Sequence, residues 1–124
     1  MTKGASRVYV VDDDSSARSA LGRLLKSAGF RVKAFASAQE FLDCGRVESN
    51  AVMILDVRMP GTSGLELQKR LTNRGGTLPI IFLTAFEDPG ARSEALERGA
   101  VAFLQKPVDE QVLFEALKKA GARN

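Results

Sequence analysis

The stretch VYVVDDDSSARSALGRLLKSAG, residues 8–29, contains the unit from which the rest of the chain is built. It begins with four apolar residues, as a buried strand does, and continues with apolar residues at the spacing of an amphipathic helix. The serines before this helix and Gly29 after it are its expected caps. Between strand and helix stand Asp12, Asp13 and Asp14, whose like charges are unfavourable together unless a cation or a shifted proton compensates them.

Taken alone, these three acids are open to two interpretations. A solvated turn whose carboxylates cap the following helix is a common structural use of such residues. The alternative is a metal site, in which acidic oxygens bind a hard divalent cation. The remaining sequence has to decide between them.

The unit of strand followed by helix recurs four more times. Apolar runs typical of buried strands occupy residues 31–35 (RVKAF), 51–56 (AVMILD), 79–84 (PIIFLT) and 101–105 (VAFLQ). The helices expected after them begin at the pairs Ser37/Glu40 and Ser63/Glu66, at Asp88 before Pro89, and at Asp109. Such alternation predicts an α/β fold: a doubly wound, five-stranded parallel sheet with five helices on its two faces.

Length and composition indicate a single folded unit of ordinary globular type. The chain has 124 residues, 44% hydrophobic and 27% charged, which suffices for a core without disulfide or metal staples. The net charge of +3 is small and the basic residues are spread along the sequence, so we expect no direct nucleic-acid binding by this domain. Because the chain has no histidine, His-based metal sites, Ser-His-Asp hydrolysis and a phosphohistidine carrier role are excluded.

Two features predict a cytoplasmic location. Cys44 is the only cysteine, so no internal disulfide can form, and the first residues, MTKGASR, lack the apolar segment of a secretory signal. Apolar runs such as residues 51–55 are far shorter than a membrane span requires. We therefore expect no membrane association.

Polar side chains gather at the carboxyl ends of the predicted strands. Asp12 and Asp13 follow the first strand, Asp56 ends the third, Thr84 ends the fourth and Lys106 follows the last. In a doubly wound sheet these ends meet at one edge, which is where ligands bind. Three carboxylates, a hydroxyl and an ammonium at one edge suit a hard divalent cation together with a phosphoryl group, and we expect the cation to be Mg²⁺.

Several stretches, VVDDD, LDVRMPGTSGLEL, IIFLTA and FLQKP, resemble the signature motifs of the response-regulator receiver domain, the CheY-like family. The resemblance extends over essentially the whole chain. It implies one receiver domain over residues 1–124, with a flavodoxin-like sheet in the strand order 2-1-3-4-5. The stretches VRMPGTSGLELQ and GAVAFLQKPVD look most like receivers of the FixJ group, which precede a LuxR-type DNA-binding domain.

The resemblance implies a role for each acid. Asp56 matches the aspartate that accepts a phosphoryl group from a sensor histidine kinase, as the nucleophile of an in-line displacement. Asp13 matches a direct Mg²⁺ ligand, and Asp12 matches an acid that acts largely through water. Arg58 occupies the position whose backbone carbonyl completes the metal shell. Asp14 is then expected to cap the following helix.

The resemblance also implies a set of switch residues. Thr84 and Lys106 match the residues that contact the phosphoryl oxygens, and Phe103 matches an aromatic residue that changes rotamer on activation. Pro107 matches a proline usually preceded by a cis bond. Phosphorylation is then expected to remodel the fourth helix and the last strand, where a partner, or a second copy as a homodimer, would dock.

Two other functions have to be weighed. A small aspartyl-phosphate hydrolase places a second acid two residues after its nucleophile, but this chain has Arg58 there. A degenerate receiver that only binds partners would lack residues that are intact here, namely Asp13, Asp56, Thr84 and Lys106. We therefore expect a receiver that catalyses its own phosphoryl transfer and dephosphorylation, is not a turnover enzyme, and controls a transcriptional output. The sequence leaves open whether the receiver stands alone or belongs to a longer regulator in which a C-terminal output domain binds the DNA.

The phosphorylated state is expected to be long-lived. In the family, the residues two beyond the acceptor and two beyond the threonine flank the path along which water attacks the acyl phosphate, and here they are Arg58 and Phe86. A bulky cation beside an apolar ring would obstruct that path. Neither group can act as a general base, so slow hydrolysis is predicted.

Overall fold

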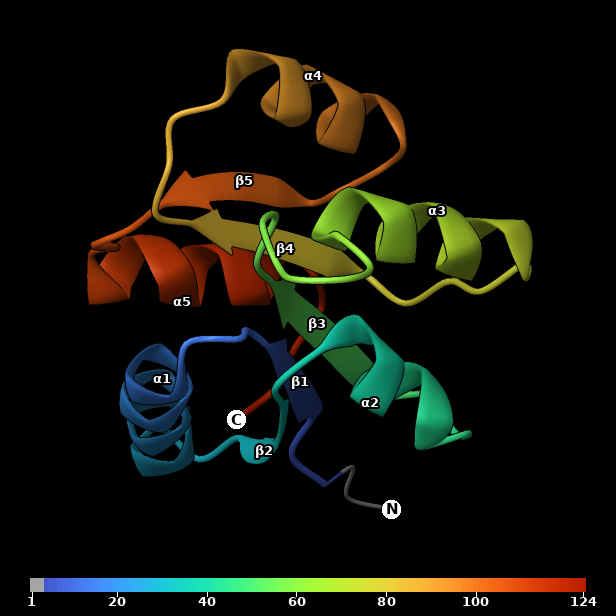
Figure 1. The fold of residues 1–124 in the computed structure, drawn as a ribbon. Coiled ribbons are helices and arrows are strands. Elements are labelled where there is room, and N and C mark those ends of the chain that lie inside the picture. Colours follow the sequence, from blue (N-terminus) through green and yellow to red (C-terminus); the bar gives the residue numbers. More distant parts are fainter. Residues whose placement is uncertain (1–3) are drawn as a thin grey trace.

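Five parallel strands form one sheet in the order β2-β1-β3-β4-β5, which confirms the predicted order. The computed structural model describes residues 4–124, so the first three residues of the predicted domain lie outside the described part. The strands are β1 (Arg7–Val11), β2 (Arg31–Phe35), β3 (Ala51–Leu55), β4 (Ile80–Thr84) and β5 (Ala102–Gln105). Because neighbouring strands are all parallel, their carboxyl ends point to the same edge of the sheet (Figure 1).

Helices cover both faces of this sheet. They are α1 (Ser15–Ser27), α2 (Ala38–Asp43), α3 (Gly64–Asn73), α4 (Pro89–Glu97) and α5 (Glu110–Lys119). Figure 1 shows α1 and α5 on one face, α2 and α3 on the other, and α4 beside β5. The predicted doubly wound α/β fold is therefore confirmed. Within residues 4–124, no helix is both long and apolar enough to cross a membrane.

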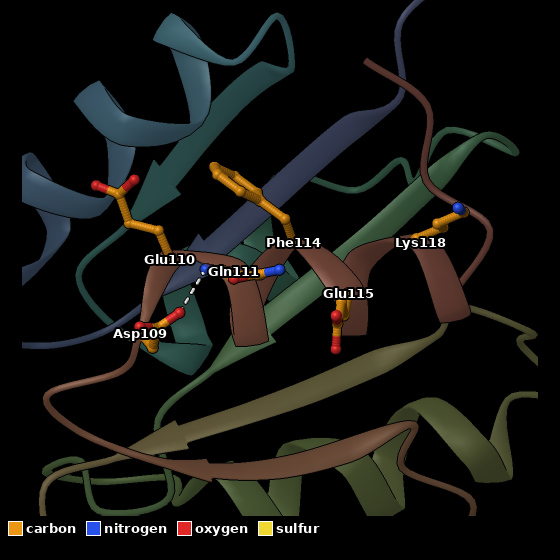
Figure 2. Close-up of a pocket in the computed structure, with 6 residues that line it drawn as sticks. All are labelled: Asp109, Glu110, Gln111, Phe114, Glu115 and Lys118. Atoms are coloured by element: carbon orange, nitrogen blue, oxygen red, sulfur yellow. Dashed lines mark hydrogen bonds between the residues drawn. The ribbon is translucent and has the colours of Figure 1, made fainter.

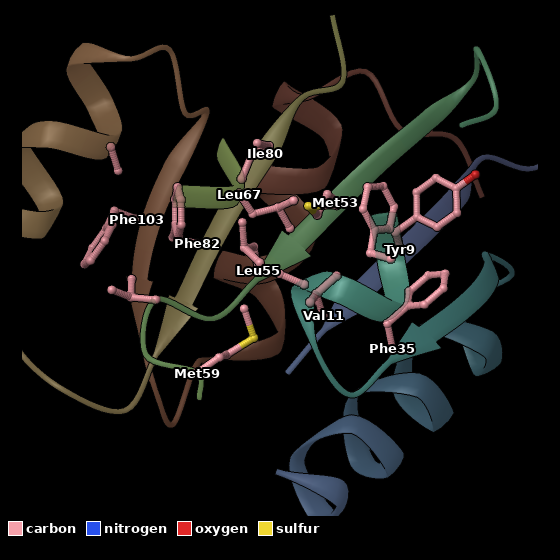
Figure 3. Close-up of a cluster of buried hydrophobic side chains, with 14 of the residues drawn as sticks. Tyr9, Val11, Phe35, Met53, Leu55, Met59, Leu67, Ile80, Phe82 and Phe103 are labelled. Atoms are coloured by element: carbon pink, nitrogen blue, oxygen red, sulfur yellow. The ribbon is translucent and has the colours of Figure 1, made fainter. Parts of the chain in front are cut away.

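Alternate residues of the strands face two separate cores. In β1, Val8 and Val10 pack in a cluster with residues of α1 and α5. Tyr9 and Val11 point the other way, into a cluster that includes Phe35 and residues of α2 and α3 (Figure 3). The central strands β3 and β4 are buried along their whole length, because helices cover them on both sides. This burial explains why their sequences are continuously apolar.

Polar residues begin the helices, with one correction to the prediction. Each of the four later helices has its predicted cap, in which a side chain accepts a backbone N–H of the first turn: Ser37, Ser63, Asp88 and Asp109. The prediction of serine caps for the first helix was wrong, because Ser15 and Ser16 lie within α1. Asp14 is its cap, which confirms the expectation drawn from the resemblance, and accepts the N–H groups of Ser16 and Ala17. Its negative charge is also favourable at a helix N-terminus.

Ser6 joins three chain segments by hydrogen bonds at the amino edge of the sheet, the edge at which the strands begin. Its side chain is fully buried. The hydroxyl accepts the Arg123 N–H at 2.8 Å and donates to Oδ1 of Asn50 at 3.0 Å. The Ser6 N–H also donates to the Arg123 carbonyl at 2.8 Å. The start of β1, the approach to β3 and the segment after α5 are thereby held together.

Glu48 forms two ion pairs at the same edge. Its two carboxylate oxygens contact Arg7 Nε at 2.8 Å and Arg31 Nη2 at 2.6 Å. Hydrogen bonds from these two arginines lower the pKa of Glu48. The starts of β1 and β2 are therefore tied to the loop that precedes β3.

Candidate functional site

The polar residues predicted for the site meet at the carboxyl edge of the sheet. Asp12 and Asp13 follow β1 directly, Asp56 follows β3, Thr84 is the last residue of β4 and Lys106 follows β5. The predicted third strand included Asp56, but β3 ends at Leu55, so the carboxylate belongs to the loop. The parallel pairing of the strands brings these residues to one place, as the sequence predicted.

Three aspartates of this edge could hold a metal ion. Asp12, Asp13 and Asp56 each offer one carboxylate oxygen, and these oxygens lie within 4.8 Å of one another. Asp12 and Asp56 are buried, whereas Asp13 is exposed. The carboxylates supply the oxygen ligands that Mg²⁺ prefers. The exposure of Asp13 leaves room for the waters that Mg²⁺ retains. The expected use of the Arg58 carbonyl as a further ligand stays a prediction.

Lys106 lies between two of these carboxylates. Its Nζ is 2.6 Å from Oδ2 of Asp12 and 3.7 Å from Oδ2 of Asp56. Burial acts against the charged ammonium, but the hydrogen bond to Asp12 and the charges of the nearby aspartates outweigh it, so the pKa of Lys106 is raised. Lys106 therefore stays protonated at neutral pH. Its peptide bond to Pro107 is cis, as the resemblance implied.

Asp56 is in an unfavourable environment for a carboxylate. Burial raises its pKa, and the charge of Asp12 raises it further. The Lys106 ammonium and the backbone N–H groups of Arg58 and Val57 lower it, but burial and the Asp12 charge prevail. Negative charge on Asp56 is thus only partly compensated by the protein, and a cation bound by the cluster would compensate it further.

Asp12 also organises the turn that follows β1. Its Oδ1 accepts the N–H of Asp14 at 2.9 Å, and its backbone carbonyl accepts Nη1 of Arg18 at 2.7 Å. The run of three acids therefore combines both interpretations that the sequence left open. Asp14 caps α1, while Asp12 and Asp13 face the cluster with Asp56.

The predicted switch residues Thr84 and Phe103 belong to the neighbouring strands β4 and β5. Thr84 is buried, and its Oγ1 accepts the Phe86 N–H at 3.4 Å. Phe103 is 9% exposed and packs against Phe82, with ring centroids 5.7 Å apart. The Phe103 carbonyl accepts Nη1 of Arg92 from α4 at 3.0 Å. Phe103 is thus directed into the core, and its rotamer change stays a prediction.

Arg58 and Phe86 face each other across the edge. The Arg58 guanidinium lies 4.5 Å from the centroid of the Phe86 ring, a cation–π contact. Arg58 Nη2 is 3.8 Å from Oδ2 of Asp88. From the sequence, Arg58 and Phe86 were expected to lie together, whereas Asp88 was expected only to cap a helix.

Gly64 is a further residue of this edge, and no sequence pattern singled it out. An added Cβ would collide with the Asp56 carbonyl oxygen and lie 3.0 Å from the Asp56 carbonyl carbon. The Gly64 N–H donates to the Val57 carbonyl at 2.8 Å. Glycine at this position therefore allows α3 to begin directly against the backbone of Asp56, in the loop after β3. The available signal was a glycine next to a helix cap, Ser63, which sequence alone does not distinguish from an ordinary turn.

A surface depression of about 590 Å³ lies elsewhere, along α5 (Figure 2). Its lining consists of Asp109, Glu110, Gln111, Phe114, Glu115 and Lys118. None of these residues belongs to the acidic cluster. Asp109 is occupied as the N-cap of α5, where it accepts the N–H groups of Gln111 and Val112. The acidic edge, rather than this depression, holds the chemically distinctive residues.

A doubly wound five-stranded sheet with metal-competent acids and a lysine at its carboxyl edge defines a CheY-like α/β domain. Residues 8–118 match the family described as the response regulator receiver domain, and the chain belongs to that family. It is thus a receiver domain of two-component response regulators, not a turnover enzyme of the usual kind.

Known relatives support this assignment. The chain is 46% identical over 123 residues to the transcriptional regulatory protein TdiR of Thauera aromatica, covering 99% of the chain and 54% of TdiR. It is 42% identical over 119 residues to the transcriptional regulatory protein FixJ of Bradyrhizobium diazoefficiens, covering 96% of the chain and 57% of FixJ. The crystal structure of FixJ-N superimposes with a TM-score of 0.87 at 36% identity, over 97% of this chain and 94% of that one. The chain spans about half the length of the curated relatives.

Proposed function

We propose that this domain, residues 1–124, accepts a phosphoryl group from a sensor histidine kinase onto Asp56 in a Mg²⁺-dependent reaction. One observation carries the proposal: three carboxylate oxygens lie within 4.8 Å of one another beside a lysine ammonium 3.7 Å from Asp56. Phosphorylation then switches a partner-binding surface and controls a transcriptional output. The names of the relatives TdiR and FixJ, both transcriptional regulatory proteins, support that output.

The residues of the edge divide the chemistry among them. The Asp56 carboxylate attacks phosphorus, and the bond from phosphorus to the donor's nitrogen breaks as the new bond to oxygen forms. Bound Mg²⁺ supplies positive charge for the phosphoryl oxygens, and Asp12, Asp13, Asp56 and the Arg58 carbonyl would hold it. The ammonium of Lys106 compensates further charge, and the Thr84 hydroxyl donates a hydrogen bond.

The role of Asp56 as phosphoryl acceptor can be tested by comparing it with another acid of the chain, Asp14. Asp56→Asn should abolish phosphorylation by acetyl phosphate with Mg²⁺, because an amide is a far poorer nucleophile than a carboxylate. Asp14→Asn is the matched control: asparagine also caps helices, so this variant should be modified like the parent. Mass spectrometry of the intact protein measures the added phosphoryl group. Equal modification of Asp56→Asn and the parent would show that Asp56 is not the acceptor.

Asp13 can be tested through the metal. Removing its exposed carboxylate in Asp13→Ala should weaken Mg²⁺ binding, since a charged oxygen ligand is lost. A Mg²⁺ titration of the unphosphorylated protein measures this. An unchanged titration would contradict the assignment.

The partners and the location follow from the same function. We propose a cytoplasmic domain whose direct partner is the kinase, with DNA bound only by a separate C-terminal output domain and with no membrane association. Thr84, Phe103 and Pro107 would remodel α4 and β5 on phosphorylation, so that two copies dimerise there. Sedimentation with and without beryllofluoride, a phosphoryl mimic, tests the dimer. Identical monomers in both samples would refute it.

The contact between Arg58 and Phe86 supports a long-lived phosphoryl group. The guanidinium and the ring shield the acceptor side of the edge together, at 4.5 Å, and neither can activate water. The domain would still catalyse its own slow dephosphorylation. Dephosphorylation with Mg²⁺ should be faster in Phe86→Ala and Arg58→Asn than in the parent. Equal rates in all three proteins would eliminate the shielding.

A further inference from the structure

The outer edge of β2 is unpaired. Within residues 4–124, β2 pairs with β1 alone. The Arg31 N–H and the Phe35 carbonyl are hydrogen-bonded on the side of β1, each at 3.1 Å. Because the backbone groups of successive strand residues point to opposite sides, those of Val32 and Ala34 point to the outer edge. Among the described residues, only the Val32 carbonyl has a partner there, Nη1 of Arg7 at 3.3 Å.

A groove of about 400 Å³ lies between β2 and α1, which Figure 1 shows side by side. Val32 and Ala34 line it from β2, and the middle of α1 contributes Gly22. Within 4 Å, a Cβ at Gly22 would meet only Val32 Cγ1, at 3.9 Å, so the packing does not require glycine there. Glycine within a helix lowers stability relative to alanine. The missing side chain leaves the groove open.

The helix side of this groove is basic. Arg18, Arg23 and Lys26 line it, and within the described part of the chain no acidic residue does. Arg18 is held in place because its Nη1 donates to the Asp12 carbonyl at 2.7 Å. None of the three cations forms an ion pair with a residue of the range 4–124. Positive charge without a partner therefore lies beside an unpaired strand edge.

We propose that the groove and the edge of β2 together bind an acidic, extended segment of another protein, which adds a sixth strand to the sheet. Backbone hydrogen bonds to Val32 and Ala34 hold the segment, as in other cases of strand addition. Arg18, Arg23 and Lys26 span about 12 Å along the helix axis. Three alternate residues of a strand span about 13 Å. Alternate acidic side chains of the segment thus match the spacing of the three cations.

Charge and hydrogen bonding decide against two other occupants. Pairing the β2 edges of two copies of this chain brings their basic grooves toward each other, and Lys33 is exposed in the middle of β2. Like charges that meet across strands are destabilising, and lysine on an edge strand protects against such pairing. A nucleic acid offers phosphates to the cations, but its backbone has no amide donor for the Ala34 carbonyl. An acidic peptide segment satisfies both the cations and the strand edge.

The first test measures the role of charge in the unphosphorylated chain. The probe is a fluorescein-labelled heptapeptide of alternating glutamate and threonine, whose binding is followed by anisotropy. Arg23→Gln and Lys26→Gln should each weaken binding by roughly 2- to 5-fold, as expected for exposed ion pairs. Lys69→Gln, an exposed position on α3 at the other face of the sheet, is the matched control and should bind like the parent. Equal losses in all three variants, or a parent that does not bind the peptide, would overturn the proposal.

The second test measures the role of the strand edge. In the parent, bound peptide should slow amide hydrogen exchange at Val32 and Ala34 but not at Lys33, whose N–H faces β1. Ala34→Pro removes an outer N–H without removing a bond to β1, and proline is tolerated on edge strands. Peptide binding should be lost in this variant, while its far-UV circular dichroism stays that of the parent. Peptide binding to the parent without protection of Val32 and Ala34 would overturn the strand addition.

Two further measurements test the other occupants. An oligothymidine with the same charge as the peptide should bind more weakly than the peptide does. Tighter binding of the oligothymidine, lost in Arg23→Gln, would assign the groove to nucleic acid and overturn the proposal. Sedimentation of the chain alone should give the same mass for the parent and for Ala34→Pro. A parent dimer that Ala34→Pro dissociates would show that a second copy occupies the edge, and would overturn the proposal as well.

Discussion

The two edges of the sheet use similar charge arrangements with opposite signs. At the amino edge one anion, Glu48, contacts two arginines, at 2.8 and 2.6 Å. At the carboxyl edge one cation, Lys106, contacts two aspartates, at 2.6 and 3.7 Å. A third acid, Asp13, joins only the carboxyl edge.

The two arrangements have opposite effects on their carboxylates. The arginines lower the pKa of Glu48, so folding favours its charged form. Burial and the neighbouring Asp12 raise the pKa of Asp56, so folding disfavours its charged form. The amino edge holds the fold together, whereas the carboxyl edge keeps partly compensated negative charge where a metal ion and a phosphoryl group would use it. This is the usual exchange of stability for function at a site.

The largest effect is expected where the backbone packs most closely at the carboxyl edge. Gly64→Ala should lower the free energy of unfolding by about 3 kcal/mol, because the new Cβ must displace the Asp56 backbone. Gly22→Ala in α1 is the matched control, since its Cβ would only touch Val32 at 3.9 Å. That change should stabilise the helix by about 0.5 kcal/mol. Urea unfolding measures both, and equal effects would show that the close approach is not constraining.

The amino edge should respond most strongly at Ser6. Ser6→Ala leaves the Arg123 N–H and Asn50 Oδ1 without their buried partner, at an expected cost of about 2 kcal/mol. Ser19→Ala, an exposed position within α1, should have almost no effect. Thermal unfolding of the two variants compares them. A neutral Ser6→Ala would mean that this edge does not depend on its buried hydroxyl.

At the carboxyl edge, removing a charge should stabilise the protein. Asp56→Asn should raise the free energy of unfolding by about 1 kcal/mol at pH 7 without Mg²⁺. Because the folded pKa of Asp56 is raised, the carboxylate costs stability above that pKa, and the cost disappears as pH falls below the ordinary value of 3.8. The difference between variant and parent should therefore shrink in acid. A less stable Asp56→Asn at pH 7 would reverse the contrast between the two edges.

The smallest effect is expected when the charge of Glu48 is removed at the amino edge. Glu48→Gln should cost about 0.5 kcal/mol at pH 7, since solvent screens its two ion pairs. Because folding lowers the pKa of Glu48, its charged form stabilises the folded state at pH values above 4.5, the ordinary pKa of the group. This contribution is lost as the pH falls through the pKa of the folded state. The cost should therefore vanish in acid and decrease in high salt. A cost that persists at low pH would indicate a role for the side chain other than charge.

Much of the fold could be predicted because its signals are local. Apolar runs identified all five strands, and helical spacing of apolar residues together with cap and stop signals identified all five helices; the cap residues of the four later helices were found from short patterns. The errors were also local. The serine caps of α1 gave way to Asp14, and Asp56, Pro79 and Val101 lie just outside the strands assigned to them. The edge that gathers Asp12, Asp13, Asp56, Thr84 and Lys106 followed from the parallel order alone.

The sequence by itself therefore determined which elements form, in what order, and which polar residues share an edge. The tertiary structure decided how those residues meet: that Lys106 lies closer to Asp12 than to Asp56, that Arg58 stacks on Phe86, and that Gly64 lies against the Asp56 backbone. Periodicity and caps depend on neighbours a few residues apart along the chain. Contacts between residues as distant as Asp12 and Lys106 depend on how whole strands and loops pack, at the scale of single ångströms, which no local pattern encodes.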